Sequence, residues 1–300
     1  MSKIEIYQPG HCYDKMIHQY QKGKVKGTTT YNKNIDEAWT WRLQEFNIWT
    51  GYANEGKSLM LKQLCLIKAL EEGKKFIFSS PEDYPPEEFF DDMIHTISGG
   101  STDKDRKNYI SKELYDKCFD LIKDKFYFLY IKPPFNTIEN VILQMEELIK
   151  KEEIYACIID PILKFTPSDK APDRDDRYAG YIGTLLVDFA RRHNVSMHMV
   201  MHQNTPKIIE STGCYPKPNM YNVKGGGSWN DGADNLVFVQ RPLYAKDKMD
   251  DTVLFGSQKI KKQKLVGIPQ EMKFKFNRLT NRYTDMNDQD IFYFDKFLTK

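Results

Sequence analysis

Eight consecutive residues near position 50 have the types and spacing to bind a phosphate. The segment 51–58 reads GYANEGKS and fits the pattern G-x-x-x-x-G-K-[ST]. Its glycines allow backbone N–H groups to curl around a β-phosphate, and a helix starting here would add its positive N-terminal end. Lys57 would neutralise the β- and γ-phosphates of ATP, while the Ser58 hydroxyl would coordinate Mg²⁺. The expected nucleotide contacts are Gly51, Asn54, Glu55, Gly56, Lys57 and Ser58.

Two carboxylates follow apolar runs and could complete such a site. Asp160 ends the run IYACII, and at the C-terminal end of a strand it would hold the magnesium through water. Glu82 comes shortly after FIFSS and could polarise the attacking water as a general base. Glu82 also stands in a cluster of acids that would suit the start of a helix, so both interpretations stay open. The acids of this cluster are Glu82, Asp83, Glu87, Glu88, Asp91 and Asp92.

Polar side chains close another apolar run at positions 201–203, MHQ. His202 or Gln203 could contact the γ-phosphate and report its loss, or both could be ordinary polar residues at a strand end. The long segment 204–227 follows, with three lysines and a run of three glycines, and a second loop at 166–176 carries Lys170 and Arg174. Long loops in compact domains tend to be functional or disordered. Two loops leaving adjacent strand ends would suit a ligand threaded past the sheet, while solvated surface loops are the alternative.

A basic stretch lies late in the chain, at 259–264, KIKKQK. Between Lys259 and Arg282 there are eight basic residues and one acid, Glu271. This positive charge could bind a phosphate, either of nucleic acid or of a nucleotide on a neighbouring subunit. Solubilising charge on an edge strand is the alternative.

The composition excludes several classes of protein. Of the 300 residues, 40% are hydrophobic and 13% aromatic, which argues for a sizeable core and against general disorder. The net charge of +2 indicates no bulk attraction to nucleic acid or membrane. The five scattered cysteines include no CxxC pair, which argues against a disulfide framework or a zinc ribbon and for a reducing, cytosol-like compartment. No run approaches the roughly 18 apolar residues of a membrane span, and the N-terminus lacks a signal-peptide core. We expect a cytoplasmic protein.

The apolar pattern also predicts the elements that must position these residues. Residues 1–30 are polar and read as an arm or linker, and residues 31–300 read as one ATPase domain. The pattern predicts strands at 46–50, 76–80, 126–131, 154–159 and 195–201, and helices at 57–72, 85–97, 104–123, 137–153 and 177–192. Continuously apolar strands separated by helices indicate an α/β fold with a mostly parallel sheet covered on both faces. Later strands at 236–239, 252–260, 271–277 and 291–294 have no helices between them and predict an antiparallel C-terminal extension.

In this order, the segments resemble the RecA-like motor domain of superfamily 4 replicative helicases. The resemblance is to the DnaB type, especially its Twinkle-like and phage primase-helicase branch, and covers roughly residues 27–285. Its landmarks are FNIWTGYANEGKS, FSSPED, CIIDP, MHQN, GGGSWNDGADNLVFVQR and KIKKQKLVG. The first landmark is specific, and the others carry weight through their order and spacing.

The resemblance implies the function and the role of each matched residue. Glu82 becomes the catalytic base, Asp160 the magnesium partner, and His202 or Gln203 the sensor. The two loops become the DNA-contacting loops of a ring, so the chain would be an ATP-driven, 5′-3′ DNA helicase, expected to be hexameric, acting on single-stranded DNA. No primase or collar domain is recognisable, so such a partner, or a loader, would be separate, absent or replaced by the arm at 1–30. A phage-encoded protein would act in the cytoplasm of a bacterial host.

One departure from the family falls at its finger motif, the basic segment that reaches the nucleotide site of a neighbouring subunit. Here stand Lys262 and Lys264, where the family usually has a lysine and then an arginine. A lysine cannot reproduce the two-pronged contact of a guanidinium with phosphate. The role of reaching a neighbouring site therefore falls to Lys264, or to Arg241 or Arg278. A RecA- or RadA-like recombinase and a non-translocating ATP-binding assembly protein are the alternatives to the helicase.

Overall fold

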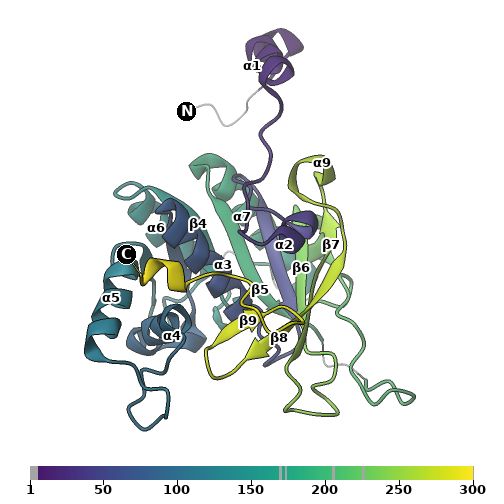
Figure 1. Ribbon diagram of the computed structural model, residues 1–300. Helices are drawn as coiled ribbons and strands as arrows, with labels where there is room; N and C mark the ends of the chain where they lie inside the picture. Colours follow the sequence, from purple (N-terminus) through teal and green to yellow (C-terminus); the bar gives the residue numbers. More distant parts are fainter. Residues whose placement is uncertain (1–5, 169–170, 173, 205–206, 225–226, 300) are drawn as a thin grey trace.

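A single twisted sheet forms the centre of the molecule (Figure 1). The computed structural model describes residues 6–168, 171–172, 174–204, 207–224 and 227–299. Nine strands are hydrogen-bonded in the order β3-β2-β4-β5-β1-β6-β7-β8-β9. The strands from β3 to β6 run parallel, and β7, β8 and β9 continue the sheet in antiparallel fashion. The predicted α/β fold with an antiparallel extension is confirmed.

The parallel strands are mostly apolar because both of their faces are covered. They are β1 Phe46–Gly51, β2 Lys75–Ser79, β3 Phe126–Phe128, β4 Ile154–Ile159, β5 Ser196–His202 and β6 Asn235–Gln240. Every residue of β1, β4 and β6 is buried. Along β1, Trp49 packs into the apolar cluster on one face of the sheet, and Phe46 and Ile48 pack into the cluster on the other. This alternation across a strand explains why an unbroken apolar run was the correct signal.

Two groups of helices cover the two faces. The first apolar cluster receives side chains from α2 Lys33–Ala38, α3 Lys57–Glu72, α4 Pro86–Ser98 and α5 Lys112–Ile122. The second receives them from α6 Ile138–Ile149, α7 Asp175–His193 and the short α8 Ser228–Gly232. The predicted helix at 104–123 begins only at Lys112, since the Ser111 hydroxyl caps it by accepting a hydrogen bond from the backbone of Leu114 at 3.2 Å.

The antiparallel part differs from the sequence prediction at its end. Strands β7 Thr252–Ile260 and β8 Glu271–Asn277 have the predicted bounds. The last strand is β9 Arg282–Thr284, and the predicted strand at 291–294 is wrong. Ile291, Phe292 and Phe294 are nevertheless buried in the first apolar cluster, so their hydrophobicity came from packing and not from strand pairing.

The N-terminal arm contains a helix that stands clear of the body (Figure 1). Helix α1 spans Pro9–Lys22, starts with proline at its first position and has no buried residue. The last residues of the predicted arm, however, pack against the body of the protein. The Gly27 backbone donates to the Leu265 carbonyl at 2.7 Å, and Thr28 forms an isolated bridge with Trp41. The chain therefore joins the body at about residue 27.

Candidate nucleotide site

The phosphate-loop segment connects β1 to α3 in the way that the motif requires. Gly51 ends β1, and a Cβ atom there would lie 2.1 Å from the Val239 carbonyl oxygen, so no larger residue fits. Gly56 caps α3 with φ +89°, a left-handed conformation that suits glycine. Asn54 has φ +61°, which asparagine tolerates better than most residues. The first turn of α3 thus points its unpaired N–H groups toward the loop.

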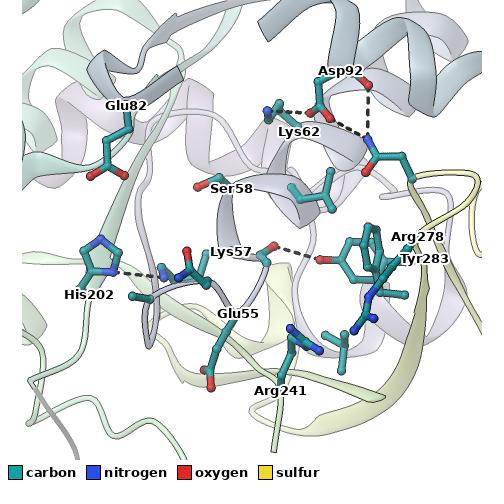
Figure 2. Close-up of a pocket in the computed structure, with 17 residues that line it drawn as sticks. Glu55, Lys57, Ser58, Lys62, Glu82, Asp92, His202, Arg241, Arg278 and Tyr283 are labelled. Atoms are coloured by element: carbon teal, nitrogen blue, oxygen red, sulfur yellow. Dashed lines mark hydrogen bonds and ion pairs between the residues drawn. The ribbon is translucent and has the colours of Figure 1, made fainter. Parts of the chain in front are cut away.

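A cavity of about 550 Å³ opens beside this loop at the carboxyl edge of the parallel strands (Figure 2). It brings together predicted residues from five separate parts of the chain: Asn54, Glu55, Gly56, Lys57, Ser58, Glu82, His202, Arg241 and Arg278. The volume is within the range of small-molecule sites. Further lining residues that sequence reasoning missed are Lys62, Asp92, Phe276, Asn281 and Tyr283.

Lys57 is buried at the floor of the cavity. Its ammonium donates to the Tyr52 carbonyl at 2.7 Å and lies 3.3 Å from His202 Nδ1. Burial lowers the pKa of Lys57, while the nearby carboxylates of Asp160, Glu55 and Glu82 oppose this effect. A phosphate would supply the negative charge that so buried an ammonium requires.

Ser58 and Asp160 form the candidate metal pair. Asp160 directly follows β4, which lies between β2 and β5 in the sheet, and the Ser58 side chain is close enough to lower the pKa of its carboxyl. Burial raises the pKa of Asp160 to about 6, against lowering contributions from Ser58 and Lys57. A hydroxyl and a carboxylate are hard oxygen ligands of the kind that Mg²⁺ takes alongside substrate phosphates. Within the described part of the chain, no three His, Cys, Asp or Glu residues gather as a self-sufficient metal site. The residues therefore fit a magnesium ion that arrives with nucleotide.

Glu82 faces the cavity from a short 3₁₀ turn, Pro81–Asp83, between β2 and α4 (Figure 2). Its side chain is 44% exposed, and one carboxylate oxygen lies 3.3 Å from the Lys164 ammonium. The acids in the first turn of α4 are Glu87 and Glu88. The turn thus separates Glu82 from the acids that suit the helix start.

His202 and Gln203 end β5 but point in different directions. His202 lines the cavity next to Lys57, and burial together with the Lys57 charge lowers the pKa of its imidazole. Gln203 is buried and donates to Thr50 Oγ1 at 2.9 Å and to the Asn219 carbonyl at 3.0 Å, while its own oxygen accepts from the Asn219 backbone at 3.1 Å. His202 is therefore placed to meet a phosphate, and Gln203 connects the end of β1 to the loop at 204–227.

Both predicted loops leave the carboxyl edge of the sheet, after β4 and β5. In the 204–227 loop, Lys217 pairs with Glu271, and the Lys224 backbone donates to the His202 carbonyl at 2.9 Å. Lys207 is exposed. Lys170 and two residues of the glycine run lie outside the described residues.

Arg241 and Arg278 lie in the cavity of their own chain. Arg241 follows β6 and stacks on Tyr244 at 4.3 Å from the ring centre. Both guanidinium groups donate to the Lys248 carbonyl, at 2.9 and 3.0 Å, which ties the 243–250 loop to the cavity rim. Both arginines are thus placed beside the phosphate loop of the chain that carries them.

Lys262 and Lys264 lie at the opposite edge of the sheet. Lys262 is 3.6 Å from Glu45, which directly precedes β1, and Lys264 belongs to the short helix α9, Gln263–Val266. The chain reaches this edge because β7 runs antiparallel to β6, with Ile260 paired to Asn235 at the start of β6. Neither lysine lines the cavity of its own chain.

The sequence missed a polar network behind the phosphate loop. The Lys62 ammonium donates to Asp92 at 2.8 Å, and Asn281 donates to the same carboxylate at 2.8 Å (Figure 2). Burial disfavours the charge on Lys62, but Asp92 and Asp83 outweigh it and raise the pKa of the ammonium. Burial also raises the pKa of Glu55 to about 7, although its carboxylate accepts from the Tyr52 backbone at 3.2 Å.

Comparison with solved structures defines the class of this fold. One solved ATPase domain of a DnaB-like replicative helicase superposes with a TM-score of 0.76 at 13% identity and covers 94% of this chain and 100% of that domain. Another DnaB-like replicative helicase, described together with its interactions with primase, gives a TM-score of 0.72 at 12% identity over 94% of this chain and 68% of that one. The fold is therefore that of the RecA-like ATPase domains of DnaB-like helicases.

One relative is similar to the chain in sequence. The chain is 22% identical over 279 residues to a Twinkle homologue of chloroplasts and mitochondria from Arabidopsis thaliana. The match covers 91% of this chain but 39% of the length of that relative. No family model matches the chain. The predicted resemblance to superfamily 4 motor domains is confirmed by these neighbours. Among the described residues, no helix has the length and hydrophobicity to cross a bilayer.

Proposed function

We propose that the chain is an ATP-hydrolysing DNA helicase motor that assembles as a hexameric ring and moves along single-stranded DNA. One observation carries this proposal: Lys57, Ser58 and Glu82 line one cavity, Asp160 lies next to Ser58 at the end of β4, and both loops leave the same edge of the sheet. Ligands of open α/β sheets bind at this edge. Phosphoryl transfer needs mainly positioning and charge stabilisation, which these groups supply.

In the proposed reaction, the N–H groups of the loop and the Lys57 ammonium hold the β- and γ-phosphates. Ser58 and Asp160 would hold Mg²⁺, which would supply positive charge to the phosphate oxygens. Glu82 accepts a proton from the attacking water, since its half-exposed carboxylate borders the cavity. His202 stays neutral at neutral pH because its pKa is lowered, so it can respond to loss of the γ-phosphate without carrying charge.

Several finer points belong to the same proposal. His202 and the 204–227 loop are adjacent in sequence and joined by the Lys224–His202 backbone hydrogen bond, which offers a direct link from the phosphate to a DNA-contacting loop. The finger would be Lys264 of a neighbouring subunit, with Lys262 beside it. A 5′-3′ direction and a separate primase or loader are proposed from the likeness to replicative helicases, and a cytoplasmic location is proposed from the free cysteines.

The test is the ATPase rate with and without single-stranded DNA, measured together with the oligomeric state by mass photometry. We expect ring-sized particles whose hydrolysis rises several-fold with DNA. Forked duplexes carrying only a 5′ or only a 3′ tail then report the direction of unwinding. Filaments on DNA would indicate a recombinase, and ATP binding without DNA-stimulated turnover would indicate an assembly protein; either result would refute the helicase.

A further inference from the structure

Tyr283 occupies the back of the phosphate loop, although it stands 227 positions after Gly56. It belongs to β9, and its side chain is fully buried with the ring 5.4 Å from that of Phe276. Its hydroxyl donates to the Gly56 carbonyl at 3.0 Å (Figure 2). A Cβ atom on Gly56 would lie 2.5 Å from this hydroxyl, so the two residues are closely fitted.

The Gly56 carbonyl matters because its peptide unit also carries the N–H of Lys57. A trans peptide is planar, and its C=O and N–H point in opposite directions. The carbonyl points along α3, where it also accepts from the Met60 backbone at 2.9 Å. The Lys57 N–H must then point out of the helix end, toward the phosphate cavity. A contact that fixes the orientation of the Gly56–Lys57 peptide plane therefore also sets the direction of the Lys57 N–H, which is one of the hydrogen-bond donors to the phosphate.

We propose that Tyr283 is a positioning residue for the phosphate loop, which orients and polarises the Gly56–Lys57 peptide so that its N–H meets a nucleotide phosphate. The inference rests on the proposed function, because it takes the bound anion to be the phosphate chain of ATP. A hydrogen bond to the carbonyl oxygen strengthens the donor at the other end of the same peptide. In this proposal Tyr283 acts through the Gly56–Lys57 peptide and not through a contact of its own with phosphate.

The hydroxyl has the right protonation state for this role. A carbonyl oxygen can only accept, so the phenol must be the donor, and burial raises the pKa of Tyr283 well above its usual range. Tyr283 thus stays protonated at any pH at which the protein would act.

The hairpin that carries Tyr283 is held in place by other bonds. Gln63 of α3 accepts from the Tyr283 backbone at 3.2 Å and donates to the Asn281 carbonyl at 2.7 Å. Asn281 also binds Asp92 of α4. Removing the hydroxyl alone should therefore leave the hairpin and the fold intact.

The test is Tyr283→Phe, with binding of ATP, tripolyphosphate and adenosine measured by competition against a fluorescent ATP analogue. We expect the dissociation constants for ATP and tripolyphosphate to rise about 2- to 10-fold, the worth of one neutral hydrogen bond. Adenosine binding should stay within twofold, and in turnover KM should rise while kcat changes little. Tyr115→Phe is the matched control, since the Tyr115 hydroxyl also donates a hydrogen bond, to Asp91 at 2.7 Å, outside the cavity.

The outcomes separate this inference from the proposed function. If Tyr283→Phe weakens adenosine as much as ATP, or leaves tripolyphosphate binding at the parent value, the positioning role is overturned. Because the three ligands are compared within one variant, a modest loss of stability does not obscure the result. Lys57→Ala provides the reference: if it also leaves tripolyphosphate binding unchanged, the nucleotide site itself is wrong.

Discussion

Lys264→Ala is expected to lower ATP hydrolysis while leaving the phosphate site of its own chain intact, because of where the sheet places it. Gly51, at the start of the phosphate loop, lies against Val239, which pairs with Phe255 of β7. From Phe255, the strand runs about 17 Å to its end at Ile260, and Lys264 follows in α9. A lysine ammonium reaches only about 6 Å from its backbone, by bonds of about 1.5 Å. Lys264 therefore cannot reach the phosphate site of its own chain, and the proposed finger role requires the site of a neighbouring subunit.

Mixing two inactive variants measures this directly. Lys57→Ala removes the ammonium that would neutralise the phosphates and keeps Lys264. Lys264→Ala removes the finger and keeps the phosphate loop intact. In a head-to-tail ring formed from equal amounts of both, about a quarter of the interfaces would join an intact loop to an intact finger. Steady-state hydrolysis should thus recover to as much as about a quarter of the parent rate if interfaces act independently. Native mass spectrometry confirms that the rings contain both chains.

Two further variants sharpen the experiment. Lys264→Arg should hydrolyse at least as fast as the parent, because the guanidinium offers a second hydrogen bond to the transferring phosphate. Lys112→Ala removes an exposed lysine of α5 and should change nothing. If mixed rings show no recovery, Lys264 does not complete a shared site, and the ring-motor proposal loses its trans-acting residue.

Three other predictions test the remaining parts of the site. Glu82→Gln should still bind ATP but should turn over at least tenfold slower, since the amide keeps the shape and cannot accept the proton; a smaller loss would make Glu82 an ordinary surface acid. Because burial raises the pKa of Asp160 to about 6, its native state binds the proton more tightly than the unfolded chain, and stability falls as pH rises from about 4 to 6. Asp160→Asn should therefore gain up to about 3 kcal/mol in urea unfolding at pH 7 and little at pH 4, and Mg²⁺-dependent nucleotide binding of the parent should weaken below pH 6; an equal gain at both pH values would contradict the raised pKa. Replacing Lys207, Lys217 and Lys224 together by alanine should weaken single-strand binding and flatten the slope of log K against log salt by up to about 2; an unchanged slope would move the DNA path elsewhere.

Local pattern was sufficient for much of the fold. The phosphate loop, α3 with its terminating Gly73, and the strands β4, β7 and β8 have the predicted bounds. Each depends on a signal within a few residues, namely a glycine that permits a left-handed turn or an apolar run with polar ends. The order of these elements along the chain also predicted the parallel sheet and the helicase-like resemblance.

Sequence reasoning also found about half of the residues that line the cavity, since parallel strands deliver their C-terminal ends to one edge. It could not tell His202 from Gln203, because one residue step along a strand reverses the face and only the fold shows which face meets the cavity. The hydrophobic run at 291–294 was misread as a strand because apolar content does not distinguish pairing from packing.

The sequence by itself thus determined the phosphate loop, the sheet that carries it and the carboxylates at its edge. The tertiary structure alone decided which distant groups complete the site. It placed Tyr283 behind Gly56, joined Asn281 to Asp92, and carried Lys264 to the far edge of the sheet. These relations join residues from β9, the turn before it and the helices that are far apart in the chain, and no periodicity or spacing encodes them. They arise because antiparallel strands added beyond β6 return the chain alternately to the two edges of the sheet.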